Sequence, residues 1–418
     1  GYHDAVNSAL GFNWFKAWGA NGYSNTSLSR SHIKYDINYS DTASDDLIFQ
    51  NDSWEHVVTL RNVNYFRVSD KHRFNFGFEV QYLDTHNDYK LGAGVDVAGN
   101  PYPDIHVDVR QDSGRYAGFL NYTLNPATRL SLNLGLRLDY LSFNRNMNVS
   151  PRASLSYRLS NRTSVNAAAG VFFQNLPNLL LLQNEAHRGL KDPTALHYVL
   201  GINHMLTEST RLTIEGYYKD YRNMPLDSQQ PGLFILDEIY YNGFYTYHER
   251  LEDVGRAHSY GVEIMIQKKL AERLYGLVSA SYFRTFYRDL AGEWRPRVYD
   301  NRFIVAVEGG YRPGRFWEFS CKWNYAGGVP YTPFDLEASE AANSGIFDMA
   351  RINGERLEPY HSLNLRADKR FHFGRSNLTL YFSVWNVYNR KNTAFIFWNT
   401  LENRPDVENQ WGLLPILG

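Results

Sequence analysis

Aromatic and amide side chains gather where the chain leaves two extended segments. Phe172 and Gln174 end one segment, and Asn175 opens the long connection after it. A second connection, over residues 239–248, is rich in tyrosine. Tyrosine offers a large contact area and loses little rotamer entropy on binding, which suits the capture of sugars, peptide side chains, aromatic chelates or haem. We predict ligand contacts at Phe172, Gln174, Asn175, Tyr240, Tyr241, Tyr245 and His248.

The same rings have a second interpretation. Aromatic residues also form girdles where a membrane protein meets the lipid–water interface, and they pack loop against loop. Both interpretations stay open at this point.

Charged side chains recur at alternate positions of the extended segments. An Arg or Lys that faced lipid near the membrane midplane would cost about 2–4 kcal/mol. If the segments are membrane-spanning strands, we therefore expect these residues to face away from lipid, toward a polar lumen, where they either form cross-strand charge pairs or contact a group held in the lumen. They are Arg137, Asp139, Glu215, Lys219, Glu263, Arg366 and Asp368.

Residues that could catalyse a reaction lack a recognisable setting. The Gly-x-Ser-x-Gly, His-Glu-x-x-His and phosphate-cradling glycine motifs are absent. The 13 histidines are scattered, and the single cysteine, Cys321, excludes an internal disulfide and a Cys-based zinc site. We expect no enzymatic activity, no cofactor and no bound metal.

The segments that position these residues alternate with period two. Between Leu130 and Tyr140, leucines occupy one face, and polar residues such as Asn133 and Arg137 occupy the other. A strand sends successive side chains to opposite faces, so this is a strand with one apolar and one polar side. The pattern recurs and predicts about seventeen strands, most of a length that suits a tilted membrane strand.

The connections between these strands alternate in length. Short polar turns lie near residues 125–128, 160–163, 207–210, 271–273, 312–315 and 374–377. Long segments span residues 175–194, 225–257, 289–300 and 330–359. Outer-membrane barrels have short periplasmic turns and long outer loops, so the sequence predicts a transmembrane antiparallel β-barrel.

Composition agrees with this class and excludes others. The 43 basic and 44 acidic residues nearly cancel, which argues against a nucleic-acid partner. Aromatic residues make up 16 % of the chain, which argues against disorder. No run approaches the roughly 18 apolar residues that a transmembrane helix needs.

Several sequence blocks, in a fixed order, carry a family resemblance. The chain resembles the C-terminal part of the barrel of TonB-dependent outer-membrane receptors, of the kind common in Bacteroidota. The blocks are Ser150–Ser160 (SPRASLSYRLS), Ala169–Gln174, His197–Ile202, Glu215–Tyr221, Ser259–Ile264, Tyr299–Phe303, Tyr325–Pro333, Tyr360–Arg366, Asn386–Arg390 and Trp411–Gly418.

The resemblance implies a larger assembly. Family members have a 22-stranded barrel closed by an N-terminal plug. The resemblance implies that the lumen-facing charges named above contact this plug or line a transport path. Residues 1–418 would then form a partial barrel of approximately strands six to twenty-two, with the last strand cut short and the plug outside this chain. The implied partners are the TonB complex, acting through the plug, and outer-membrane lipid. A surface lipoprotein over the mouth, as in some Bacteroidota importers, is left open.

The function implied by the resemblance is active import across the outer membrane. The loops would bind a scarce nutrient, and TonB would supply the energy. Whether the nutrient is a small molecule, a peptide or a glycan is left open. The alternatives are a passive porin-like channel without a plug and a soluble all-β binding or adhesion protein.

Overall fold

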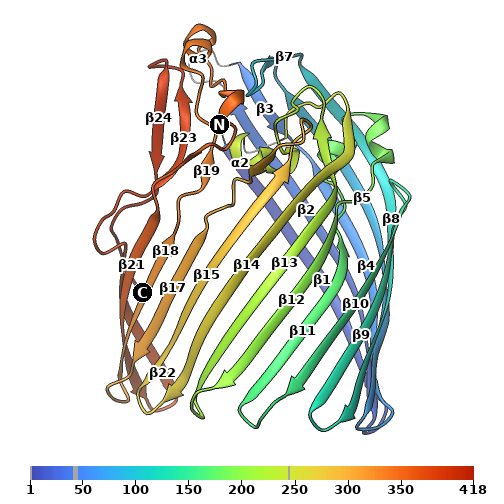
Figure 1. Cartoon of the computed structure of the whole chain (residues 1–418), viewed down its shortest axis with the longest axis vertical. Helices are drawn as coiled ribbons and strands as arrows, with labels where there is room; N and C mark the ends of the chain where they lie inside the picture. The colour runs from blue at the N-terminus through green and yellow to red at the C-terminus, as the bar shows by residue number, and fades with distance from the viewer. Residues whose placement is uncertain (1, 41–45, 243–244) are drawn as a thin grey trace.

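One antiparallel β-sheet dominates the computed structural model, which describes residues 2–40, 46–242 and 245–418. The sheet curls into a barrel wall (Figure 1). Its strands are β1 (Tyr2–Ala17), β2 (Gly22–Ser40), β3 (Leu47–Asn51), β4 (Trp54–Arg67), β5 (His72–Leu91), β8 (Ile105–Ala127), β9 (Leu130–Leu141), β10 (Asn146–Arg158), β11 (Thr163–Phe173), β12 (Thr194–Met205), β13 (Thr210–Asp227), β14 (Leu251–Ala271), β15 (Leu274–Arg288), β16 (Trp294–Pro296), β17 (Phe303–Tyr311), β18 (Trp317–Ala326), β21 (Tyr360–Phe373), β22 (Ser376–Trp385) and β25 (Leu414–Leu417).

The sheet has 19 strands in the described part of the chain. Strands β3 and β4 both pair with β2 and β5, so they are two pieces of one wall strand. Strand β16 only extends the outer end of β15. Counted this way the wall has about seventeen strands, which confirms the all-β barrel fold predicted from the alternation. Assigning them to strands six to twenty-two of a larger barrel stays a prediction.

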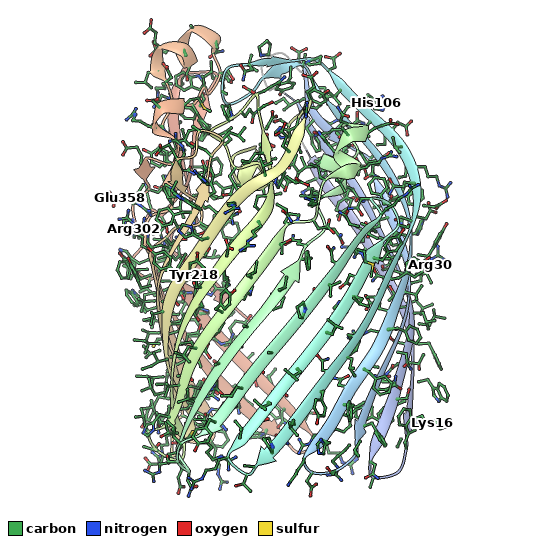
Figure 2. The ribbon with its side chains drawn as sticks, turned by 45° about the vertical axis from the view of Figure 1, so that its right-hand side comes forward. Lys16, Arg30, His106, Tyr218, Arg302 and Glu358 are labelled. Atoms are coloured by element: carbon green, nitrogen blue, oxygen red, sulfur yellow. The ribbon has the colours of Figure 1, made fainter. Side chains whose placement is uncertain are left out.

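The two ends of the wall differ as the connection lengths predicted. Turns at one end are short, and Gly374 makes the β21–β22 turn with a positive φ of 59°. Long connections with short helices gather at the other end (Figure 1). Figure 2 places Lys16 near the short-turn end and His106 near the long-loop end. Among the described residues, no helix is long and apolar enough to cross a membrane.

The long connections contain the remaining elements. Their helices and 3-10 turns are α1 (Asn178–Leu181), η1 (Glu185–Gly189), η2 (Ile235–Asp237), α2 (Glu238–Asn242), α3 (Leu336–Ala342) and η3 (Met349–Arg351). Their strand pairs are β6 (Gly94–Val95) with β7 (Pro101–Tyr102), β19 (Pro330–Tyr331) with β20 (Glu355–Arg356), and β23 (Thr393–Asn399) with β24 (Arg404–Asn409).

The outer face of the wall is apolar and exposed. On β9, Leu134, Leu136 and Leu138 are 55 %, 45 % and 40 % exposed. In a soluble sandwich such a face would be buried against a second sheet. The buried hydrophobic clusters lie instead among the long connections and the strand ends next to them. This arrangement disfavours the soluble alternative and matches a wall that faces lipid.

Candidate functional site

Two long connections pack against each other at the outer end of the wall. Leu180 and Leu181 of α1 are fully buried beside Ile235 of η2. The segment after β11 therefore touches the segment after β13, although about 55 residues separate them in sequence. Since these loops share a hydrophobic core, they form a folded cap whose surface has a defined shape.

A cavity of about 450 Å³ lies where this cap meets the wall. Four predicted ligand contacts line it, and they come from both connections. The residues lining it are Phe172, Phe173, Gln174, Asn175, Leu176, Pro177, Pro193, Thr194, Ala195, His197, Tyr221, Met224, Phe234, Leu236, Tyr245 and Arg297. The structure thus brings Phe172, Gln174, Asn175 and Tyr245 to one site.

Phe172 is the centre of a stack of aromatic and cationic groups. The Arg152 guanidinium lies 4.4 Å from the Phe172 ring centroid, and the His197 ring lies 4.5 Å from it on the next strand. The register pairs Gly170 with both Arg152 and His197, so all three side chains project from the same face. Sequence reasoning missed Arg152 and His197. The alternation of β10, which puts Arg152 on the face of Ser150 and Ser154, could have found Arg152.

A second cavity, of about 230 Å³, adjoins the first and shares Phe172, Phe173 and Asn175 with it. Its charged lining is rich in arginine. The charged residues are Glu79, Arg115, Arg137, Asp139 and Arg152. Three guanidinium groups against two carboxylates leave an excess of positive charge, and the two cavities together suit an anionic ligand that also carries flat apolar groups.

Arg297, in the β15–β17 connection, also lines the first cavity. Its Nε donates to Asp237 at 3.1 Å, and its guanidinium lies 4.5 Å from the Phe234 ring centroid. Burial alone would lower the pKa of Arg297, but the hydrogen bond to Asp237 holds that pKa above its usual value. This arginine was not predicted, because its partner lies 60 residues away.

Two of the predicted loop contacts, His248 and Tyr245, are buried, and their contact with a ligand stays a prediction. His248 is fully buried, and its Nδ1 and Nε2 donate to Asp227 at 2.7 Å and Glu238 at 3.0 Å. Tyr245 is only 8 % exposed, and burial raises its pKa to about 12. They hold the cap together from inside, because the two connections bury each other. Of the two, only Tyr245 reaches the cavity lining.

The remaining predicted ligand contacts in the loops differ in their exposure and in their partners. Asn175 donates to the Asp192 carboxylate at 2.9 Å, and the Gln174 side chain is exposed. The Tyr240 ring meets the Tyr299 ring edge-on at 5.7 Å and does not line the cavity. Tyr241 belongs to α2, and its side chain lies outside the described part of the structure. Ligand contact at all of these positions stays a prediction.

The predicted lumen charges pair along strands. Arg137 donates to Asp139 on its own strand, and the closest contact is 2.7 Å. Arg366 pairs in the same way with Asp368, at 2.6 Å. These ion pairs run along a strand rather than between strands, because residues two apart share a strand face and a long arginine reaches its neighbour.

Among the described residues, the other three predicted charges form no ion pair of this kind. Glu215 and Glu263 are directly opposite each other on β13 and β14. The Lys219 ammonium lies 5.0 Å from the Tyr217 ring centroid on the same strand. Contact of any of these residues with a plug or solute stays a prediction.

Comparisons with known proteins identify the fold family. The family described as TonB dependent receptor-like, beta-barrel matches residues 2–387. The chain belongs to this family. Its members are outer-membrane receptors and transporters, not enzymes, which places the chain in the bacterial outer membrane. No curated protein sequence matches the chain.

Solved structures similar to this TonB-dependent receptor barrel show the same fold. The ferric-catecholate import receptor Fiu from E. coli K12 matches with 13 % identity and a TM-score of 0.72 over 100 % of this chain and 64 % of its own. The ferric citrate transporter FecA matches with 12 % identity and a TM-score of 0.69, over 99 % of this chain and 61 % of its own. The ferric yersiniabactin uptake receptor FyuA from Yersinia pestis matches with 13 % identity and a TM-score of 0.67, over 98 % of this chain and 60 % of its own. The chain spans less than two thirds of each of these structures.

Proposed function

We propose that this receptor barrel takes part in energy-coupled import and binds an anionic metal chelate beneath its outer loops. The observation that carries the proposal is the pair of adjoining cavities, in which Arg152 stacks on Phe172 beside further arginines. A guanidinium pairs with carboxylate or catecholate oxygens, and an aromatic face contacts the flat part of a chelate.

The proposed energy source is a TonB complex acting through a plug. The outer membrane holds no nucleotide triphosphate, so a barrel that concentrates a solute needs energy from a partner. Fiu, FecA and FyuA are import receptors for ferric chelates, which supports the same class of substrate here. A passive channel would need neither the partner nor a binding site with stacked arginine and phenylalanine.

Equilibrium binding by the native protein tests the proposed site. The protein is extracted in detergent from its outer membrane and titrated with ferric citrate and, separately, a ferric tricatechol chelate. At least one chelate is expected to bind in the micromolar range or tighter. The Arg152→Gln variant is expected to bind about tenfold more weakly, a loss of about 1.4 kcal/mol.

Arg158→Gln is the matched control. Arg158 lies on the same strand, is exposed and does not line either cavity. Its variant should bind like the wild type. If neither chelate binds, or if both variants bind equally well, the proposed site is wrong.

A further inference from the structure

Along the lipid-facing side of β14, the exposed residues change from aliphatic to aromatic to cationic toward the long loops. Ile264 and Val262 are exposed aliphatic residues, Tyr260 is an exposed aromatic residue, and Arg256 is an exposed cation. These positions are an even number of residues apart, so they share one face of the strand. Aromatic girdles mark the level of the lipid headgroups. Arg256 therefore lies just beyond the hydrocarbon, on the outer-leaflet side.

The neighbouring strand, β15, also has an exposed aliphatic, an exposed aromatic and an exposed cationic residue in this order. On β15, Val278 and Tyr282 are exposed on the same face, and Arg288 is exposed further out. The register pairs Arg256 directly with Arg288. Figure 2 labels Tyr218 of β13, the strand on the other side of β14, on the wall below the loop-bearing end.

Two like charges directly opposite each other on adjacent strands repel and destabilise a sheet. Within the described residues, neither Arg256 nor Arg288 has a carboxylate partner within 4.0 Å, although the Arg288 Nε donates to the Gly292 carbonyl at 3.0 Å. Nearby acidic residues are already engaged. Asp220 pairs with Arg222, Glu252 with Arg250, and Asp289 with Arg295.

A cavity of about 350 Å³ contains both arginines. The rest of its lining is mainly apolar, and Asp289, the one acidic member, is bound to Arg295. The lining residues are Leu226, Val254, Arg256, Arg288, Asp289, Leu290, Ala291 and Gly292. Val254 and Leu290 are exposed beside the arginines, and Trp294 is opposite Arg288 with its ring 4.4 Å from His258.

We propose that Arg256 and Arg288 form a binding site for a phosphate-bearing lipid headgroup of the outer leaflet. One phosphate bridging the two guanidinium groups would remove their mutual repulsion, because guanidinium binds phosphate oxygens through paired N–H donors. The apolar lining and Trp294 would contact the sugar or glycerol part of the headgroup. The site is on the outside of the wall, so it is separate from the cavities inside the barrel and does not depend on transport.

The test is a titration of the native, detergent-extracted protein with bisphosphorylated lipid A, followed by native mass spectrometry. The double variant Arg256→Gln/Arg288→Gln is expected to bind lipid A at least about tenfold more weakly than the wild type. Lipid A stripped of phosphate should bind the wild type as weakly as lipid A binds the double variant. Arg256→Lys/Arg288→Lys keeps both charges but lacks the paired N–H donors, so its binding should fall between that of the wild type and that of the glutamine variant.

The matched control removes two arginines from the short turns at the opposite end. Arg129→Gln/Arg162→Gln changes the charge by the same amount, and both residues are exposed. This control should bind lipid A like the wild type. Heat-modifiable migration on a gel confirms that each variant is folded.

Three results would overturn the proposal. The first is equal lipid A binding by the folded glutamine variant and the wild type. The second is equal binding of lipid A with and without phosphate. The third is binding of inorganic phosphate as tight as that of lipid A, since the site would then serve a free anion rather than a lipid.

Discussion

The His248 imidazole donates to the Asp227 carboxylate at 2.7 Å, with both side chains almost completely buried. The other ring nitrogen donates to Glu238, which also accepts a hydrogen bond from Thr246. Asp227 ends β13 and Glu238 begins α2, so one histidine joins the wall to its cap. Nearby, the buried His187 donates to the Leu180 carbonyl and accepts from the Leu251 amide, which ties the first connection to β14.

Replacing His248 with glutamine should loosen the cap while leaving the wall intact. Removing one partner of a buried ionic cluster costs about 3–5 kcal/mol, because the remaining charges lose their compensation. Protease added to intact cells should cleave the variant within residues 228–250 much faster than the wild type. His106→Gln, which removes an exposed histidine paired with Asp88, should leave the cleavage rate unchanged. Equal cleavage of His248→Gln and wild type would contradict the structural role of His248.

The contribution of His248 should depend on pH. Burial opposes its charge, but the hydrogen bonds to Asp227 and Glu238 outweigh burial and raise its pKa to about 9. Because the folded pKa exceeds the usual value of about 6.5, this stabilisation is complete below pH 6.5 and is lost as pH rises through about 9. Hydrogen exchange of the cap should be slower in wild type than in His248→Gln at pH 6, and the difference should shrink by pH 10. A constant difference would contradict a folded pKa of about 9 for His248.

The exposed leucines of β9 should face lipid. Leu134→Arg places a cation on the apolar face and should cost about 2–4 kcal/mol near the midplane. Asn133→Arg puts the same side chain on the opposite face, where Asn133 now bonds Thr123 and Ser154. The amount of heat-modifiable barrel in outer-membrane fractions should fall for Leu134→Arg and stay near wild type for Asn133→Arg. Equal amounts would remove the support for a lipid-facing wall.

Phe172 should contribute to ligand affinity through its ring. Phe172→Leu keeps an apolar side chain but removes the face on which Arg152 stacks. Loss of a partly desolvated cation–π contact of about 1 kcal/mol predicts roughly fivefold weaker binding of the bound chelate. Isothermal titration with the native protein measures this change. Phe316→Leu, an exposed substitution in the β17–β18 turn, is the control and should have no effect.

The wall could be predicted from the sequence, and the cap could not. Alternation from Leu130 to Tyr140 determines which side chains face lipid, because a strand has only two faces. The burial of His248 depends on Asp227 and Glu238, whose positions follow from how two long connections pack. Phe172, Gln174 and Asn175 line the cavity together because they lie at the end of one strand, where the sequence already groups them. Tyr245 lines it because the second connection packs against the first. Arg152, His197 and Arg297 were missed because strand register and loop packing bring them there.

The most direct test of the account is energised uptake by living cells. Cells that carry the native receptor take up radiolabelled ferric citrate or ferric tricatechol chelate, whichever binds, before and after a protonophore collapses the proton-motive force. We predict accumulation that falls to background with the protonophore and that is reduced in cells carrying Arg152→Gln. Uptake that continues unchanged after the proton-motive force collapses would contradict active import and would favour a passive channel.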